Sequence, residues 1–347
     1  MKLGIIGLPQ SGKSTIFRAL TGARGETGPE VFSKAERHIS TVTVYDERVD
    51  FITDLVKPKK TTYAKVEYLL PPEIGSEGAR SESGQWSEIR TCDALLHVVR
   101  NFKGASGTDP APEEDFWTME EEMILSDLAV AEKRIERLEL DIKRGKKEGV
   151  EELELLRRCK ELLEQEIPLR SDKALSSRPK LRGFTFLSAK PQLIVVNNDD
   201  EDESMPQWER TPKDAEMMVI RGRLEMDIAN MAEEEAKEFL EAYNIQDSAL
   251  DRTIAASYQL LNLISFFTAG EQEVKAWSVA SGTSALEAAG TIHSDIKKGF
   301  IRAEVVAFED LKRYGTFQAV KKAGAMRLEG KEYIVKDGDI IHFRFNV

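Results

Sequence analysis

Short apolar runs separated by polar loops characterise the first part of the chain. The runs are Leu3–Ile6, Ile39–Val44, Lys65–Leu70 and Leu95–Val99. Runs of this length bounded by loop residues predict buried strands, and the longer segments between them indicate an α/β domain. Because the same texture returns at Pro191–Val196 and Met217–Ile220, we expect a parallel sheet that the chain leaves and later re-enters.

Between Phe116 and Gln165 the pattern changes to apolar residues spaced three and four apart in charged sequence. The positions that carry this spacing are Ile124, Leu128, Ala131, Ile135, Leu138, Ile142, Leu153, Leu156, Leu162 and Leu163. Such spacing predicts two long amphipathic helices. The segment Gly145–Gly149 interrupts it with glycine and charge, so we expect the helices to pair antiparallel as a hairpin inserted into the first domain.

The last part of the chain reads as a small mixed β domain. Segments with strand character lie at Ala276–Val279, Phe300–Phe308, Tyr333–Val335 and Ile340–Phe345. The sequence Lys336–Asp339 is a turn signal between the last two. A separate β domain is therefore expected to close the chain.

Composition narrows the class of protein. The 347 residues exceed a usual single core, and 41% hydrophobic with 32% charged residues is ordinary for a globular protein. No stretch approaches the roughly 18 uncharged apolar residues of a membrane-spanning helix. The two cysteines and four histidines lack the spacing of a disulfide framework or a zinc site. Because Met1 leads directly into a strand, we expect no cleavable signal and a cytoplasmic location.

The first strand is followed by a loop with the pattern G-x-x-x-x-G-K-[ST], at Gly7–Ser14. In such a loop, glycines let backbone N–H groups turn onto phosphate oxygens, and the next helix directs its positive end to the same place. Lys13 is expected to reach the outer phosphates and Ser14 to offer its hydroxyl to Mg²⁺. The predicted phosphate-binding residues are Pro9, Gln10, Ser11, Gly12, Lys13, Ser14 and Thr15, and the predicted metal ligand is Ser14.

The whole chain resembles the Obg-like ATPase family, also called YchF. The segments that carry the resemblance are Gly4–Pro9, His97–Arg100, Phe266–Gly270, Glu273–Trp277, Ala289–Asp295, Lys298–Val305 and Asp337–Val347. The resemblance implies an α/β fold with a Ras-like P-loop nucleotide domain, an inserted antiparallel helical hairpin and a C-terminal TGS-type β-grasp domain. It also implies ATP or GTP as the ligand, Mg²⁺ as the cofactor, and association with the ribosome or RNA.

The resemblance also suggests domain boundaries. The nucleotide domain is expected in two parts, residues 1–115 and 181–270. The hairpin is expected at 116–180, and the β-grasp domain at 271–347.

Base recognition is expected from the loop after the strand at Pro191–Val196. Its predicted base-binding residues are Asn197, Asn198 and Asp200. Relatives that bind GTP carry N-K-x-D here, whereas the Obg-like ATPases carry N-x-x-E and favour adenine. This chain has the aspartate of the GTP-binding pattern but lacks its lysine, so the sequence does not decide between guanine and adenine. A third alternative is that these polar residues only cap the end of the strand.

The chain departs from the family pattern where hydrolysis would be organised. Relatives carry D-x-x-G after the strand at Lys65–Leu70, and this chain has Leu70-Pro71-Pro72-Glu73. Leu70 cannot act on a metal. Glu73 would bring a negative charge near an anionic phosphate, which costs about 4 kcal/mol for unit charges ~4 Å apart.

No other residue clearly replaces the missing carboxylate. The region Gly28–His38 offers only Ser33 as a weak metal ligand, Asp93 is expected at the far end of its strand, and Asp199 lies in the base loop. We therefore expect slow or absent hydrolysis.

Basic clusters leave a second function open. They lie at Lys57–Lys60 and Lys143–Lys147, and in the terminal domain at Lys297, Lys298, Arg302, Lys312, Arg313, Lys321 and Lys322. Such residues could contact RNA phosphates, although solvated turns account better for the first two clusters. The net charge of −12 argues against broad binding to nucleic acid. The alternative to a nucleotide-binding protein is a nucleotide-independent scaffold or ribosome-associated adaptor.

Overall fold

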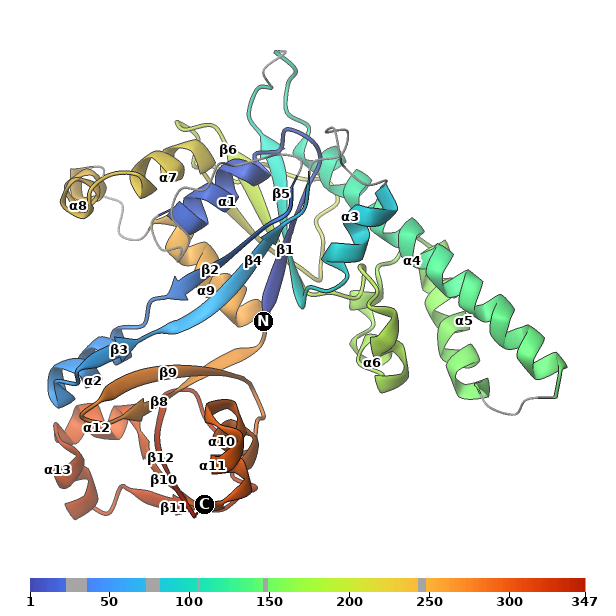
Figure 1. Ribbon diagram of the computed structural model, residues 1–347. Coiled ribbons are helices and arrows are strands. Elements are labelled where there is room, and N and C mark those ends of the chain that lie inside the picture. Colours follow the sequence, from blue (N-terminus) through green and yellow to red (C-terminus); the bar gives the residue numbers. More distant parts are fainter. Residues whose placement is uncertain (23–35, 73–81, 105–106, 146–148, 243–247, 347) are drawn as a thin grey trace. The chain divides into compact units, whose positions relative to one another are not determined.

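The computed structural model (Figure 1) describes residues 1–22, 36–72, 82–104, 107–145, 149–242 and 248–346. The chain forms two compact units. The first contains residues 1–42 and 67–253, and the second contains residues 43–66 and 254–347. The second unit therefore starts earlier than the expected boundary at 271 and includes a segment from the N-terminal part of the chain.

A six-stranded sheet forms the centre of the first unit, in the order β2-β4-β1-β5-β6-β7. The strands are β1 (Lys2–Ile6), β2 (His38–Val44), β4 (Ala64–Leu70), β5 (Ala94–Asn101), β6 (Gln192–Asn198) and β7 (Glu216–Ile220). β1 pairs in parallel with β4 and β5, and β6 pairs in parallel with β5 and β7. β6 is buried along its whole length, as its continuous apolar run predicts.

Helices of the first unit flank this sheet. They are α1 (Lys13–Gly22), α3 (Glu82–Ile89), α7 (Gly222–Ala229) and α8 (Glu233–Ala242), with the short elements η1 (Leu169–Ser171), α6 (Lys173–Ser176) and η2 (Pro179–Phe184). The helix α9 (Ala249–Leu260) begins in the first unit and continues into the second. α1 buries Ile16, Phe17 and Leu20, which share one helical face. α1 and α7 lie against each other.

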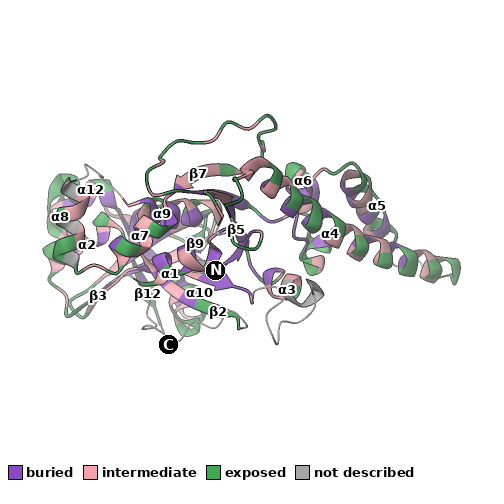
Figure 2. Cartoon of the chain, turned by 90° about the horizontal axis from the view of Figure 1, so that it is seen from above, coloured by how far each residue is buried: buried purple, intermediate pink, exposed green. Residues whose placement is uncertain are grey.

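The two long helices expected between Phe116 and Gln165 are present as α4 (Pro112–Lys143) and α5 (Val150–Glu164). Their shared face buries apolar side chains and their outer faces are exposed (Figure 2). Lys160 pairs with Glu132 at 2.7 Å, and Arg157 pairs with Glu139 at 2.7 Å. Since the lower-numbered residue of α5 pairs with the higher-numbered residue of α4, the helices run antiparallel.

The second unit is built on another six-stranded sheet, in the order β11-β10-β12-β8-β9-β3. Its strands are β3 (Lys60–Thr62), β8 (Leu263–Ala269), β9 (Glu273–Ala280), β10 (Phe300–Ala307), β11 (Arg327–Glu329) and β12 (Asp339–Phe345). Its helices are α2 (Glu47–Val56), α10 (Ala285–Ile292), α11 (Ser294–Lys298), α12 (Phe308–Tyr314) and α13 (Phe317–Lys322).

Two details of this sheet differ from the sequence expectation. β8 pairs antiparallel with β9 along its length, so residues 263–269 belong to the second unit and not to the nucleotide domain. The strand expected at Tyr333–Val335 is reduced to a single bridge between Ile334 and Ser284.

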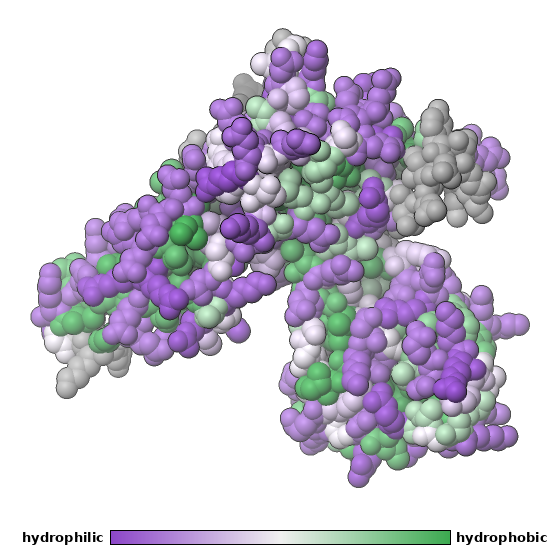
Figure 3. Space-filling model, turned by 180° about the vertical axis from the view of Figure 1, so that it is seen from behind, coloured by the Kyte–Doolittle hydropathy of each residue, from purple (hydrophilic) through white to green (hydrophobic). Residues whose placement is uncertain are grey.

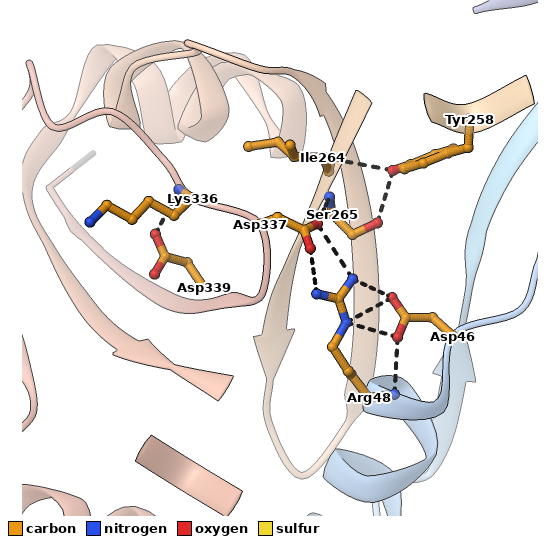
Figure 4. A network of polar contacts seen from close by, with 8 residues as sticks. All are labelled: Asp46, Arg48, Tyr258, Ile264, Ser265, Lys336, Asp337 and Asp339. Atoms are coloured by element: carbon orange, nitrogen blue, oxygen red, sulfur yellow. Dashed lines mark hydrogen bonds and ion pairs between the residues drawn. The ribbon is translucent and has the colours of Figure 1, made fainter. Parts of the chain in front are cut away.

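A polar network joins residues 43–66 to the rest of the second unit (Figure 4). The Asp46 carboxylate caps α2 by accepting from the Arg48 backbone N–H at 3.0 Å. The Arg48 guanidinium donates to Asp337 at 2.6 Å, and Asp337 accepts from the Ser265 N–H at 2.8 Å. The Tyr258 hydroxyl lies 2.8 Å from that of Ser265. The network therefore joins α2 to β8 and to the turn before β12.

Candidate nucleotide-binding site

The loop between β1 and α1 contains three residues with positive φ, two of which are glycines. Gly7 has φ 146°, Gln10 has φ 65° and Gly12 has φ 93°. A Cβ atom on Gly7 would lie 2.2 Å from the Val98 carbonyl oxygen, and one on Gly12 would lie 2.2 Å from Asn197 Nδ2. Both positions therefore require glycine for backbone angle and for close approach.

Lys13 folds back over the loop. Its Nζ donates to the carbonyl oxygens of Gly7 and Leu8, each at 2.8 Å. The side chain is only 8% exposed. The ammonium therefore lies inside the curve of the loop, the region that a triphosphate would enter.

Ser11 supplies an independent sign that this loop accepts a ligand. Its hydroxyl is buried and, in the part of the chain that the structure describes, has no hydrogen-bond partner. Buried hydroxyls normally find a partner, and the common explanation of an exception is a missing ligand or water. A phosphate oxygen would satisfy the Ser11 hydroxyl.

Asn197, a predicted base-binding residue, links two loops. Its Nδ2 donates to the Ser11 carbonyl oxygen at 3.1 Å, and its Oδ1 accepts from the Gly222 N–H at 3.0 Å. Gly222 begins α7, and a Cβ atom there would lie 2.8 Å from Asn197 Oδ1. Asn197 therefore fastens the phosphate loop to the start of α7. Gly222 was not among the predicted site residues.

Asp200 is held by the same helix start. Its Oδ1 accepts from the Leu224 N–H at 3.1 Å, and its Oδ2 lies 4.0 Å from Arg223 Nε. Its side chain is 37% exposed. One carboxylate oxygen is thus fixed by the backbone while the group stays open to a ligand.

Asn198 lies apart from these residues. Its Nδ2 donates to the carbonyl oxygens of Asp202 at 3.0 Å and Ser204 at 2.7 Å, and its Oδ1 accepts from Asn101 Nδ2 at 2.9 Å. Successive strand residues point to opposite faces, so Asn197 and Asn198 diverge. The Asn198 amide holds the turn that follows β6, and it does not join Asn197 and Asp200.

Within the described residues, the end of β4 offers no metal ligand. Leu70, at the end of β4, is 3% exposed. Asp93 accepts from the Lys2 N–H at 2.8 Å, which places it at the start of β1 and away from the loop. Glu73, Ser33 and most of Gly28–His38 lie outside the described residues.

The residues of this loop are compatible with a Mg²⁺ ion that is held mainly by the nucleotide. No group of three or more acidic, histidine or cysteine side chains gathers for a metal within the described ranges. Mg²⁺ beside a triphosphate commonly takes one or two protein oxygens and completes its shell with phosphate oxygens and water. Ser14, in the first turn of α1, is the residue that the sequence predicts for this role. The ion would neutralise phosphate charge.

His97 is a buried neighbour of the site that the sequence did not single out for a role. It lies on β5, where its Nδ1 is 2.7 Å from Gln192 Nε2 and its ring stacks on Phe116 at 5.1 Å between centroids. Burial, with added repulsion from Arg170 and Lys13, lowers the pKa of His97 from 6.5 to about 3. The imidazole is therefore neutral at physiological pH and accepts the amide hydrogen bond.

No helix within the described residues has the length and apolar character needed to cross a membrane. The surface seen in Figure 3 is mostly hydrophilic, with hydrophobic residues in small groups.

Two family models match the chain. One, described as a 50S ribosome-binding GTPase, matches residues 2–134, and the other, YchF-GTPase_C, described as a protein of unknown function, matches residues 263–346. The protein named ribosome-binding ATPase YchF of Bacillus subtilis is 42% identical over 361 residues, which cover 99% of each chain. Its namesake in Escherichia coli O157:H7 is 37% identical over 360 residues, with 100% of this chain and 99% of the relative covered.

Comparison with solved structures supports the same family. The Schizosaccharomyces pombe YchF GTPase matches with a TM-score of 0.84 at 30% identity, over 99% of this chain and 97% of that one. A GTP-binding protein from Pyrococcus horikoshii, at 16% identity and a TM-score of 0.59, shares the fold. With a P-loop GTPase fold followed by a C-terminal YchF domain, the chain belongs to the YchF family.

Proposed function

We propose that this chain binds a purine nucleoside triphosphate with Mg²⁺ and hydrolyses it slowly. The observation that carries the proposal is an intact phosphate loop beside a strand that ends in buried Leu70. Lys13, the buried hydroxyl of Ser11 and the loop amides would hold the phosphates. Asp200 would contact the base, with Asn197 positioning the loop. Asn198 is left out because its amide is used within the protein.

These residues would contribute different interactions to nucleotide binding. Lys13 supplies positive charge against the phosphates, and the start of α1 adds its partial positive charge. Asp200 supplies an acceptor for base N–H groups. Within the described residues, the end of β4 offers no carboxylate to hold a metal-bound water near the outermost phosphate. Tight binding with slow cleavage is the expected outcome.

Calorimetric titration with ATP, ADP, GTP and GDP in the presence of Mg²⁺ tests the binding. We expect at least one triphosphate to bind, and Lys13→Met to weaken it by about 100-fold, since a charge-assisted contact contributes about 3 kcal/mol. Lys173→Met, an exposed lysine on α6, serves as the control and should leave affinity unchanged. If all four nucleotides fail to bind, the scaffold function replaces this proposal. Single-turnover hydrolysis at the rate of an activated GTPase would contradict slow cleavage.

We also propose that the protein acts on the ribosome, in the cytoplasm. The relatives from Bacillus subtilis and Escherichia coli O157:H7 carry ribosome binding in their names. In this chain, exposed cations that could meet RNA phosphates lie at the end of α4 and in the second unit, at Lys143, Arg144, Lys298, Arg302, Lys312, Arg313, Lys321 and Lys322. The strand order β9-β8-β12-β10, with α10 packed on the core, supports a TGS-type β-grasp domain.

Co-sedimentation with ribosomes across a salt series tests this second proposal. We expect binding to fall steeply with salt, and the double variant Lys321→Glu with Lys322→Glu to reduce it by about tenfold or more. The control is Glu234→Lys with Glu235→Lys, on α8, which changes the net charge of the protein by the same amount in the opposite direction. This control should not reduce ribosome binding. Binding that does not depend on salt would contradict an interface dominated by phosphate contacts.

A further inference from the structure

A cavity of about 360 Å³ opens in the first unit at the base of the hairpin. Its walls come from residues 90–93 after α3, Cys159 of α5, and parts of the connection 169–191. Leu175, Leu181 and Phe186 give it an apolar side, and each of them is buried. Its volume falls in the range of small-molecule sites. No residue of the phosphate loop lines it.

Lys190 places a buried cation on the wall of this cavity. It is 8% exposed, and its Nζ donates to the carbonyl oxygens of Arg90 at 3.0 Å and Cys92 at 2.5 Å. An ammonium has three donors, and these contacts use two. Among the described residues, no carboxylate oxygen lies within 4.0 Å of it. Burial lowers the pKa of Lys190, although the nearby charges of Asp93 and Asp127 act in the opposite direction.

The charged residues of the wall leave a net positive charge around Lys190. Arg90 is paired with Asp127 at 2.8 Å, so Arg182 is the cation that adds to the charge of Lys190. Asp93, the carboxylate of the wall, accepts from the Lys2 N–H at 2.8 Å. The cavity is therefore positive in a chain whose net charge is −12.

The two carbonyl contacts have a structural explanation of their own. They lie just after the end of α3, where a cation satisfies carbonyl groups and the helix dipole. This role accounts for two donors of Lys190. It does not account for the third donor or for an apolar cavity beside a buried charge, which is costly when unpaired.

We propose that this pocket binds a small amphipathic anion, with its charged head at Lys190 and its apolar part against Leu175, Leu181 and Phe186. A carboxylate or a phosphate monoester has the required head group. An apolar body of a few carbons matches the cavity volume. The proposal does not depend on nucleotide binding.

Calorimetric titration of the full chain with octanoate tests the proposal, with octylamine and octanol as probes of the same tail and different charge. Octyl phosphate distinguishes the two head groups. We expect saturable binding of octanoate, octyl phosphate or both, and at least tenfold weaker binding of octylamine. Saturating ATP should not displace the anion, because the phosphate loop is not part of the wall.

Variants locate the site. Ser176→Trp fills the cavity at a half-buried wall position and leaves Lys190 in place, and Lys190→Met removes the charge. We expect each to weaken binding of the anion by about tenfold or more, the effect of losing one charge-assisted contact or the space for the tail. Lys173→Met, outside the wall, should have no effect. If Lys190→Met does not fold, Ser176→Trp and Arg182→Gln still decide the question.

The two cysteines of the chain give a second readout, because Cys92 and Cys159 both line the pocket. Saturating octanoate should slow alkylation of both thiols by iodoacetamide at least fivefold in the wild type. Octylamine should not. The proposal is overturned if neither anion binds at about 10 mM, which corresponds to under 3 kcal/mol. It is also overturned if octylamine binds equally well, if ATP displaces the anion, or if Ser176→Trp leaves its affinity unchanged.

Discussion

The neighbouring strands β1 and β4 run parallel, and their ends differ in chemistry. β1 ends in a loop where Gly7, Gly12 and Lys13 each have a geometric reason to be present. β4 ends in Leu70, which is buried. Both ends lie at the carboxyl edge of one sheet, the usual place for a ligand. The proposed function therefore assigns phosphate binding and phosphate cleavage to separate residues, so that a chain could keep one set while changing the other.

The largest expected effect comes from Gly12. Gly12→Ala places a Cβ atom 2.2 Å from Asn197 Nδ2 at a residue with φ 93°. We expect this substitution to weaken ATP or GTP binding by about 100-fold or more, because the loop must shift to relieve both strains. Gly183→Ala is the matched control, since nothing lies within 4 Å of its added Cβ atom. Calorimetry would measure both. Unchanged affinity of Gly12→Ala would mean that the loop is not the site.

A second test places a carboxylate at the end of β4. Leu70→Asp should lower the free energy of unfolding by about 3 kcal/mol, because Leu70 is buried. Mg²⁺ with ATP should recover more of this loss than it does in Leu70→Asn, which has the same shape without the charge. Thermal and urea unfolding would measure the difference. Equal recovery in both variants would show that position 70 faces the core and not the nucleotide.

A third test concerns β5, the other neighbour of β1, and the effect of acid pH on the free energy of unfolding. His97 has its pKa lowered from 6.5 to about 3, so the unfolded chain takes up a proton below pH 6.5 that the folded chain refuses. Stability from this residue is present above pH 6.5 and is lost as the pH falls toward 3. Between pH 7 and pH 5 the loss is about 2 kcal/mol. His97→Gln should remove this part of the pH dependence, and His342→Gln, on the exposed side of β12, should not. A wild-type slope that survives in His97→Gln would exclude this cause.

The smallest effect is expected at the base loop. Asp200→Asn exchanges one acceptor oxygen for a donor while its backbone contact to Leu224 can persist through the other oxygen. We expect a change of about 1 kcal/mol in the preference between guanine and adenine nucleotides, or about fivefold. Asn198→Ala should alter stability and leave this preference unchanged. Competition binding of GTP against ATP gives the ratio. If Asn198→Ala changed the preference between GTP and ATP more than Asp200→Asn does, Asn198 would belong to the base-binding site.

Sequence reasoning succeeded where the cause is local. Apolar runs predict β1, β5 and β6 because strand burial depends on the residues of the strand itself, and the phosphate loop follows from its glycines. It failed where the cause is a distant partner. The strand β3, Lys60–Thr62, is short and polar, and it pairs with β9 more than two hundred residues later. Likewise, the roles of Asn197 and Asn198 differ through partners at Ser11, Gly222 and Asn101.

The passage of residues 43–66 into the second unit has a consequence for synthesis of the protein. This segment is made early, and the rest of its unit begins only at residue 254, after about 190 further residues. At a synthesis rate of about 5–20 residues per second, α2 and β3 wait roughly 10–40 s for the strands they pair with. During that interval the edge that β3 offers to β9 is open to other partners. The terminal unit is thus completed only after residue 254 is made, although one of its strands leaves the ribosome long before the others.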